Sequence, residues 1–78
     1  MNKTLETYAR IDNYMEQPIR LLESLGQTED AKTLKVIQRK YRRVIDDYLI
    51  QNNIPKMTFR ISRGYEVEYT RPGATNGK

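Results

Sequence analysis

Residues 28–52 follow an uninterrupted helical pattern, which is the strongest structural signal in this 78-residue chain. Apolar side chains recur every three or four residues and form one continuous stripe when they are placed at about 100° per residue. We expect this helix to begin at Thr28, whose hydroxyl can cap the first turn, and to end at the Asn-Asn-Ile-Pro segment that starts at Asn52. The predicted stripe consists of Ala31, Leu34, Ile37, Tyr41, Val44, Ile45, Tyr48 and Leu49.

Residues 4–25 are also predicted to be helical, with the acidic residues mainly opposite an apolar stripe. Thr4 can cap the start, and Gly26 is placed to end the last turn in a left-handed conformation. Pro18 removes a hydrogen bond to the carbonyl of Tyr14, but the stripe keeps its phase across it, which favours a kinked helix. A break into two helices, with Pro18 opening the second, is the alternative. The stripe consists of Tyr8, Ile11, Met15, Ile19, Leu22 and Leu25.

Residues 56–71 alternate between apolar and polar side chains and predict a β-hairpin. A three-residue loop over residues 62–64 gathers the apolar side chains on one face and places Gly64 at the left-handed position that such loops need. On the other face this register sets Arg60 opposite Glu66. Because a two-stranded sheet is marginally stable alone, we expect its apolar face to pack on the helices. The expected apolar pairs are Ile61 with Tyr65, Phe59 with Val67 and Met57 with Tyr69.

These elements predict an α+β fold, with a single domain over residues 1–71 and a disordered tail over residues 72–78. The domain is an antiparallel helical hairpin followed by a β-hairpin. If the first helix breaks at Pro18, the order of three helices and a hairpin resembles that of a winged helix, with residues 28–52 as the recognition helix. The acidic first turn of that helix counts against this interpretation, as does the absence of the usual helix-turn-helix spacing.

The net charge of +4 conceals a strong segregation along the chain. Residues 1–31 carry three bases and six acids, whereas residues 32–45 carry six bases and no acid. A basic block of this density on one side of a helix attracts phosphate or an acidic protein surface. The plainer alternative is a solvated face, on which Arg42 and Arg43 pair with the acids one turn later. The residues predicted to bind nucleic acid or another anion are Lys32, Lys35, Arg39, Lys40, Arg42, Arg43 and, at the hairpin tip, Arg63.

Two apolar residues, Val36 and Ile50, lie among these bases at seven-residue spacing from Arg43. We interpret them as a contact for a second subunit or a partner protein. A single core of this size rarely supplies enough stability alone, and a lone hairpin leaves both sheet edges open. We therefore expect a homo-oligomer or a bound partner.

The chain contains no histidine, cysteine or tryptophan, which removes the two commonest catalytic side chains. It also lacks the ligands for a disulfide framework or for a thiolate or imidazole metal site. Glu66 and Glu68 share a strand face at the spacing of a two-carboxylate site, but Arg60 opposite Glu66 favours an ordinary salt pair. We therefore expect a non-enzymatic protein without metal or cofactor.

No apolar run approaches the ~20 residues of a membrane span, and no secretory signal is visible, so we expect a cytoplasmic location. Three functions are compatible with the pattern. The first is a nucleic-acid-binding accessory or regulatory factor of the phage or mobile-element type. The second is a small inhibitor of a host enzyme or defence complex that docks on an acidic protein surface. The third is a homo-oligomer that binds a small anionic nucleotide between its subunits.

Overall fold

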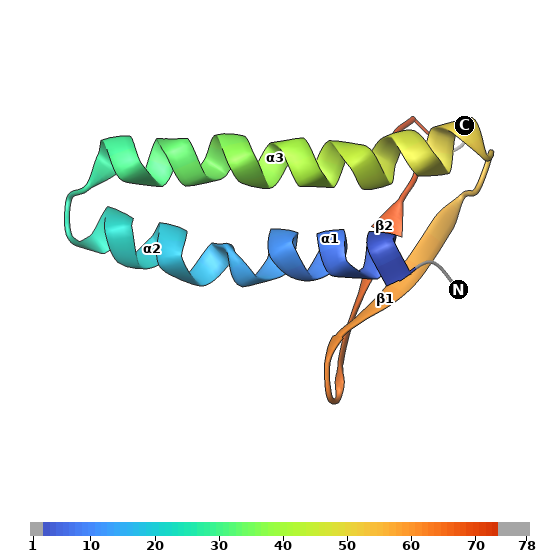
Figure 1. Cartoon of the computed structure of the whole chain (residues 1–78), viewed down its shortest axis with the longest axis horizontal. Coiled ribbons are helices and arrows are strands. Elements are labelled where there is room, and N and C mark those ends of the chain that lie inside the picture. Colours follow the sequence, from blue (N-terminus) through green and yellow to red (C-terminus); the bar gives the residue numbers. More distant parts are fainter. Residues whose placement is uncertain (1–2, 74–78) are drawn as a thin grey trace.

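The computed structural model describes residues 3–73, which form three helices and one two-stranded antiparallel sheet (Figure 1). The predicted α+β class is confirmed. The predicted tail lies outside the described residues from residue 74 onward. No helix within residues 3–73 combines the length and the apolar character needed to cross a membrane. The elements are α1 (Lys3–Tyr14), α2 (Glu16–Ser24), α3 (Thr28–Gln51), β1 (Lys56–Ser62) and β2 (Tyr65–Thr70).

The first two helices form one bent rod, and the bend lies at Met15. Proline has no N–H and its ring crowds the carbonyl four residues earlier, so Pro18 disrupts the helix at Tyr14 and Met15. The hydrogen bonds resume at once, because the Ile19 N–H donates to the Met15 carbonyl at 3.1 Å. The kinked interpretation is therefore confirmed. Pro18 does not open the second helix, because α2 already begins at Glu16.

Gly26 reverses the chain between α2 and α3, as predicted. Its φ of +79° is left-handed. The Gly26 N–H donates to the Glu23 carbonyl at 3.0 Å, and the Gln27 N–H donates to the Leu22 carbonyl at 2.8 Å. These two bonds form a Schellman motif, which satisfies carbonyls that the end of a helix leaves free.

The same motif ends α3 at the Asn-Asn-Ile-Pro segment. Asn53 takes the left-handed position with a φ of 52°, and its N–H donates to the Ile50 carbonyl at 3.2 Å. The Ile54 N–H donates to the Leu49 carbonyl at 2.9 Å, and Ile54 packs against the core. The predicted stop signal is thus confirmed, with asparagine in the position that glycine occupies after α2.

The two predicted N-terminal caps are wrong. The first helix begins at Lys3, so Thr4 lies inside it. Gln27 precedes α3, and its carbonyl accepts the Ala31 N–H at 3.1 Å, which places Thr28 within the helix. Gln27 makes no side-chain capping bond. The first helix starts one residue before Thr4, whereas α3 starts at Thr28 itself, as predicted.

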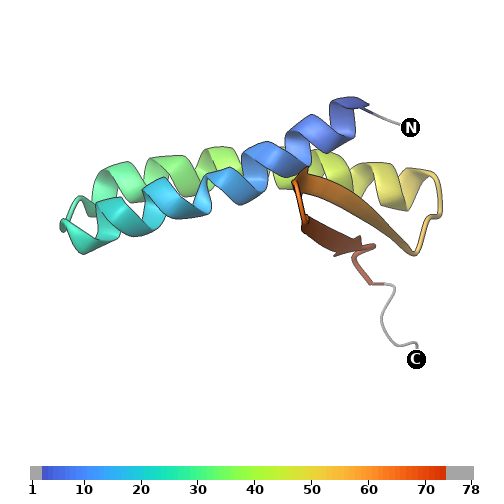
Figure 2. The ribbon, with the colours of Figure 1, turned by 90° about the horizontal axis from the view of Figure 1, so that it is seen from below.

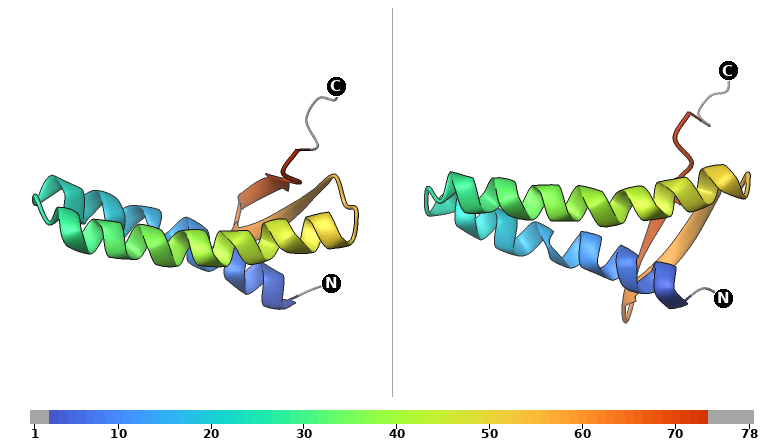
Figure 3. Two further views of the ribbon diagram at one scale, coloured as in Figure 1. Left: turned by 90° about the horizontal axis from the view of Figure 1, so that it is seen from above. Right: turned by 45° about the horizontal axis from the view of Figure 1, so that its top comes forward.

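The α1–α2 rod lies antiparallel beside α3, and the hairpin covers one face of this two-rod layer at one end (Figures 2 and 3). The hairpin end consists of α1 and the C-terminal half of α3. The other end, here called the arm, consists of α2 and residues 28–39. The radius of gyration is 14.0 Å, whereas a compact chain of this length has about 11.5 Å. The molecule is therefore elongated, with the arm extending from the hairpin end.

The core is concentrated at the hairpin end. In the arm, the buried residues are Ile19 and Ala31. Three members of the predicted stripes are substantially exposed, namely Leu25 at 73%, Ile37 at 38% and Val44 at 37%. Each predicted apolar stripe is therefore wider than the part of the helix surface that other elements of the fold cover. The core cluster consists of Leu5, Ala9, Ile45, Leu49, Phe59, Ile61 and Tyr69.

The hairpin register is as predicted except next to the loop. Ser62, not Ile61, is the partner of Tyr65, which leaves Ile61 as the extra residue of a bulge. Because Ser62 belongs to β1, the loop consists of Arg63 and Gly64 and not of the three residues predicted; Gly64 has a left-handed φ of +75°, as predicted. Tyr65 is 51% exposed, contrary to the prediction, because the tip extends past α1 (Figure 1). The confirmed pairs are Met57 with Tyr69, Phe59 with Val67 and Arg60 with Glu66.

Candidate functional site

Two of the predicted anion-binding residues lie close to carboxylates in the arm. The Lys35 Nζ is 2.7 Å from the Glu23 Oε2 across the two rods, and the Lys32 Nζ is 3.9 Å from the Glu29 Oε2. Both pairs are solvent-accessible, so each contributes little to stability. They nevertheless neutralise part of the charge at this end of the basic block.

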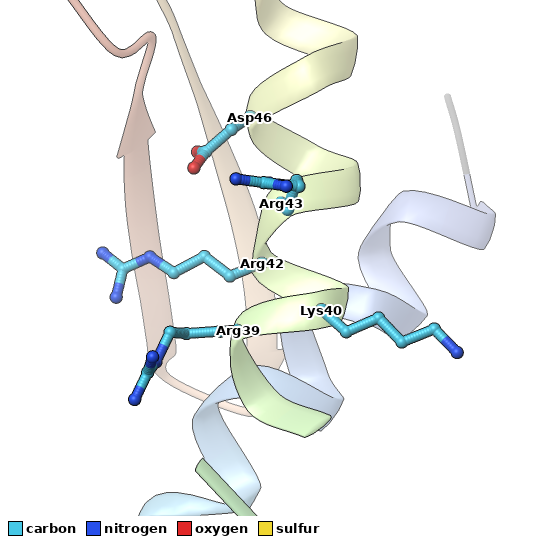
Figure 4. A pocket seen from close by; sticks show the side chains of 5 residues that line it. All are labelled: Arg39, Lys40, Arg42, Arg43 and Asp46. Atoms are coloured by element: carbon cyan, nitrogen blue, oxygen red, sulfur yellow. The ribbon is translucent and has the colours of Figure 1, made fainter. Parts of the chain in front are cut away.

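The remaining four bases of α3 surround an open depression of about 450 Å³, together with Asp46 (Figure 4). Arg39 and Arg42 extend toward the side of α3 that faces the hairpin, whereas Lys40 extends the opposite way. Within residues 3–73, Arg39 and Arg43 form no ion pair at 4.0 Å or less. We call Arg39, Arg42 and Arg43 the arginine cluster.

Arg42 is held by the hairpin rather than by an acid of its own helix. Its guanidinium carbon lies 5.8 Å from the centroid of the Tyr69 ring, a cation–π distance. In the described part of the chain, the predicted pairs of Arg42 and Arg43 with Asp46 and Asp47 do not form within 4.0 Å. The arginine cluster therefore keeps its charge available to an external anion.

Asp46 is the one acid in the depression, and its surroundings disfavour its charged form. Burial raises the pKa of the Asp46 carboxyl above its ordinary value of 3.8. The negative charges of Asp47 and Asp12 raise this pKa further, while Arg42 and Arg43 act in the opposite direction. Because the pKa rises on balance, the neighbouring arginines do not fully compensate for the burial of this carboxylate.

The other predicted basic residue, Arg63, lies apart from the arginine cluster. It sits in the loop between β1 and β2, and this tip extends past α1 on the side away from α3 (Figure 1). Arg60 is opposite Glu66 in the register, but their charged groups are not within 4.0 Å; Lys56 pairs with Glu68 at 3.5 Å instead. The hairpin thus presents separate charges and does not extend the basic block.

Val36 and Ile50 are both exposed, at 62% and 50%. Helical spacing places them on the basic side of α3, on either side of Arg43. They remain available to a partner in a single copy of the chain. Neither side chain belongs to the core cluster of the described residues or packs against it.

The sequence reasoning missed a buried polar network between α1 and β2. Asp12 is only 5% exposed, and its Oδ2 accepts a hydrogen bond from the Tyr69 hydroxyl. The Asn13 Nδ2 donates to the same hydroxyl oxygen at 3.1 Å. Beside them lies a cavity of about 110 Å³, whose lining includes Glu16 and Arg42. A signal was present in the sequence, since Asp12 is an acid within the apolar stripe of residues 4–25.

Within the described residues, no three acidic side chains gather in a way that could hold a metal ion. Comparisons with protein-family models, with curated proteins and with solved structures find no match to this chain. What the protein does must therefore be inferred from its own residues.

Proposed function

We propose that this protein is a small nucleic-acid-binding protein that uses the arginine cluster of α3 to hold a phosphate backbone. The observation that carries the proposal is the open depression around Arg39, Arg42 and Arg43, which contains only one acid. Guanidinium groups bind phosphate oxygens through two parallel hydrogen bonds. The fold leaves Arg39 and Arg43 without an ion pair among residues 3–73, so this binding breaks no internal contact of theirs.

The distribution of the bases favours a polymer over a small anion. The six basic residues of α3 extend from Lys32 to Arg43, which corresponds to about 16 Å of helix. An extended phosphate backbone offers charges over such a length. A small anion, in contrast, is bound in concave sites that remove most of its surface from water, and the depression here is open. Lys32, Lys35, Lys40 and Arg63 would then add outer contacts to those of the arginine cluster.

A winged-helix mode of binding gains no support from the layout of the helices. The rod of α1 and α2 lies along α3, so no pair of helices crosses in the manner of a helix-turn-helix (Figure 1). The first turn of α3 also carries Glu29 and Asp30, where a recognition helix would contact bases. The proposal is therefore contact with the phosphate backbone, with little dependence on base sequence.

The test is fluorescence anisotropy with a labelled 20-base-pair duplex and with the matching single strand. We expect affinity to fall steeply between about 50 and 200 mM salt. The double variant R39Q/R43Q should bind at least about tenfold more weakly, and its salt slope on the duplex should fall by up to about 1.8. The control R20Q/R60Q removes the same charge elsewhere and should bind nearly as tightly as the wild type. A flat salt dependence, or equal losses in both double variants, would overturn the proposal.

Val36 and Ile50 favour a second candidate, an inhibitor-like protein that docks the basic side of α3 on an acidic partner. Two exposed apolar side chains beside Arg43 supply the apolar contact that a protein interface needs and a phosphate backbone does not. A pull-down from lysate after nuclease treatment separates the two candidates. Under this alternative, V36S/I50S abolishes capture of the partner; under the first, the same variant retains duplex binding.

A further inference from the structure

No described element covers the face of the helical layer opposite the hairpin (Figures 2 and 3). We call it the open face. On α3, the residues that meet the hairpin include Arg42, Ile45 and Leu49, so helical spacing places Ile37 and Val44 on the other side. These two are 38% and 37% exposed despite belonging to the continuous apolar stripe. The open face therefore presents apolar surface that the single chain does not bury.

The α1–α2 rod contributes to the same face and brings no charge to it. Ile11 and Leu22 lie there by helical spacing and are only partly buried. The spacing places every charged residue between Thr4 and Leu25 on the hairpin side or on the outer edge of the rod. Scattered exposed apolar residues are ordinary, but an apolar strip along both rods, on which Asp30 in the first turn of α3 is the one charge among the described residues, marks an interaction surface.

Beyond the first turn of α3, two charges border the open face, and they are of opposite sign. Lys40 and Asp47 lie seven residues apart on the same side of α3, which corresponds to about 10.5 Å along the helix. In the described part of the chain, neither forms an ion pair within 4.0 Å. The Lys40 Nζ instead lies 5.7 Å from the centroid of the Tyr41 ring. Val44 sits close to the midpoint between the two charges.

We propose that a second copy of this chain covers the open face along residues 36–51 of α3, with the two α3 helices antiparallel about a twofold axis between Arg43 and Val44. In such an isologous contact, a residue before the axis meets the residue equally far beyond it on the other copy. Lys40 of each copy then meets Asp47 of the other, and the two Val44 residues lie beside the axis, about 1.5 Å apart along the helices. In this antiparallel register each copy therefore places a base opposite an acid of the other copy at two symmetric positions.

The second copy also adds to the core at the hairpin end. In this register residues 36–51 of the two α3 helices overlap, so the contact covers the C-terminal half of α3 and the two arms extend in opposite directions. Chains below about 70–80 residues commonly need such a supplement to their core. This proposal concerns the face opposite the hairpin and does not depend on nucleic-acid binding by the basic side of α3.

The first test is the molar mass in solution, measured by sedimentation equilibrium from about 1 to 100 μM. We expect twice the mass of one chain for the wild type and the mass of one chain for Val44→Glu. The matched control is Leu21→Glu, which adds the same charge at a more exposed position on the outer edge of the rod and should remain dimeric. A monomeric wild type, or equal dissociation of both variants, would overturn the proposal and assign the open face to a different protein.

A charge exchange tests the register and needs no change to the apolar contact. The single variants Lys40→Asp and Asp47→Lys each replace two attractive contacts by two repulsive ones and should raise the dimer dissociation constant by about tenfold. The double variant K40D/D47K restores both contacts and should return the constant to near its original value. If the double variant dimerises no better than the single ones, the antiparallel register is wrong. Circular dichroism confirms that each variant is folded.

Discussion

The hydroxyl of Tyr69 on β2 donates a hydrogen bond to the carboxylate of Asp12 on α1, and each residue exposes only 5% of its surface. A buried carboxylate is costly unless hydrogen bonds compensate for its lost hydration. The Tyr69 hydroxyl supplies such a bond from an element 57 residues further along the chain. This pair thus fixes the hairpin to the first helix by a specific polar contact in addition to apolar packing.

Replacement of Tyr69 by phenylalanine should therefore destabilise the protein by about 1–3 kcal/mol, because Asp12 loses a donor while it remains buried. The measurement is the free energy of unfolding in urea at pH 7. Tyr65→Phe is the matched control, since that tyrosine is 51% exposed and should change the free energy by less than about 0.5 kcal/mol. Equal effects of the two substitutions would show that the hydroxyl of Tyr69 contributes nothing.

The same tyrosine should make the protein sensitive to alkali. Burial, and after it the hydrogen bond and the negative charge of Asp12, raise the pKa of the Tyr69 hydroxyl above its ordinary value of 10.0. The unfolded chain releases this proton near pH 10 and the folded chain does not. The stability from this group is thus complete below pH 10 and falls as the pH rises toward the folded pKa. The free-energy gap between wild type and Tyr69→Phe should narrow between about pH 9 and pH 11; parallel curves would contradict this.

Asp46 also has a raised pKa, so its contribution to stability should likewise be lost as the pH rises, here in the acidic range. Burial raises its pKa above 3.8 in the folded chain, so its favourable contribution is present below that pH and is lost as the pH rises through the raised pKa. Asp46→Asn should therefore increase the free energy of unfolding at pH 7 and leave it nearly unchanged near pH 3. The substitution also removes the acid from the arginine cluster. Duplex affinity should rise under the proposed function, and a fall would contradict it.

Gly26 should be sensitive to any side chain for a conformational reason alone. An added Cβ would meet no atom within 4 Å, but the φ of +79° is one that L-residues rarely adopt. We expect Gly26→Ala to cost about 1–2 kcal/mol, which corresponds to a fall in the melting temperature of several degrees, on the order of 4–8 °C per kcal/mol. Gly26→Asn should cost less, because asparagine tolerates this conformation. Equal costs for alanine and asparagine would point to another cause.

The elements of this fold can be predicted from the sequence because their signals are local. The stripe of residues 28–52 defines α3, and Gly26 and Asn53 mark the two helix ends by their backbone requirements. The alternation in residues 56–71 fixes most of the register. The helix starts were predicted to within one residue, but the capping roles of Thr4 and Thr28 were not, since both threonines lie inside their helices.

The environment of the candidate site depends on contacts that local patterns do not contain. Glu23 lies against Lys35 because of how α2 aligns with α3, and helical spacing within α3 says nothing about that alignment. Arg63 lies apart from the cluster because of the angle at which the hairpin crosses α1. Arg42 lies over Tyr69 rather than against Asp46 because the fold places β2 beside α3. The residue types of the site were therefore visible in the sequence, but not which charges remain free.

The separation between the hairpin end and the arm has a consequence for how this chain can vary. The sheet touches neither the Gly26 turn nor the first turns of α3 (Figures 1 and 2). Two extra turns in α2, matched by two in α3, would carry the Gly26 turn outward and leave every contact of the hairpin in place. The reach of the arm is thus an adjustable dimension, which evolution or design can lengthen heptad by heptad without rebuilding the core.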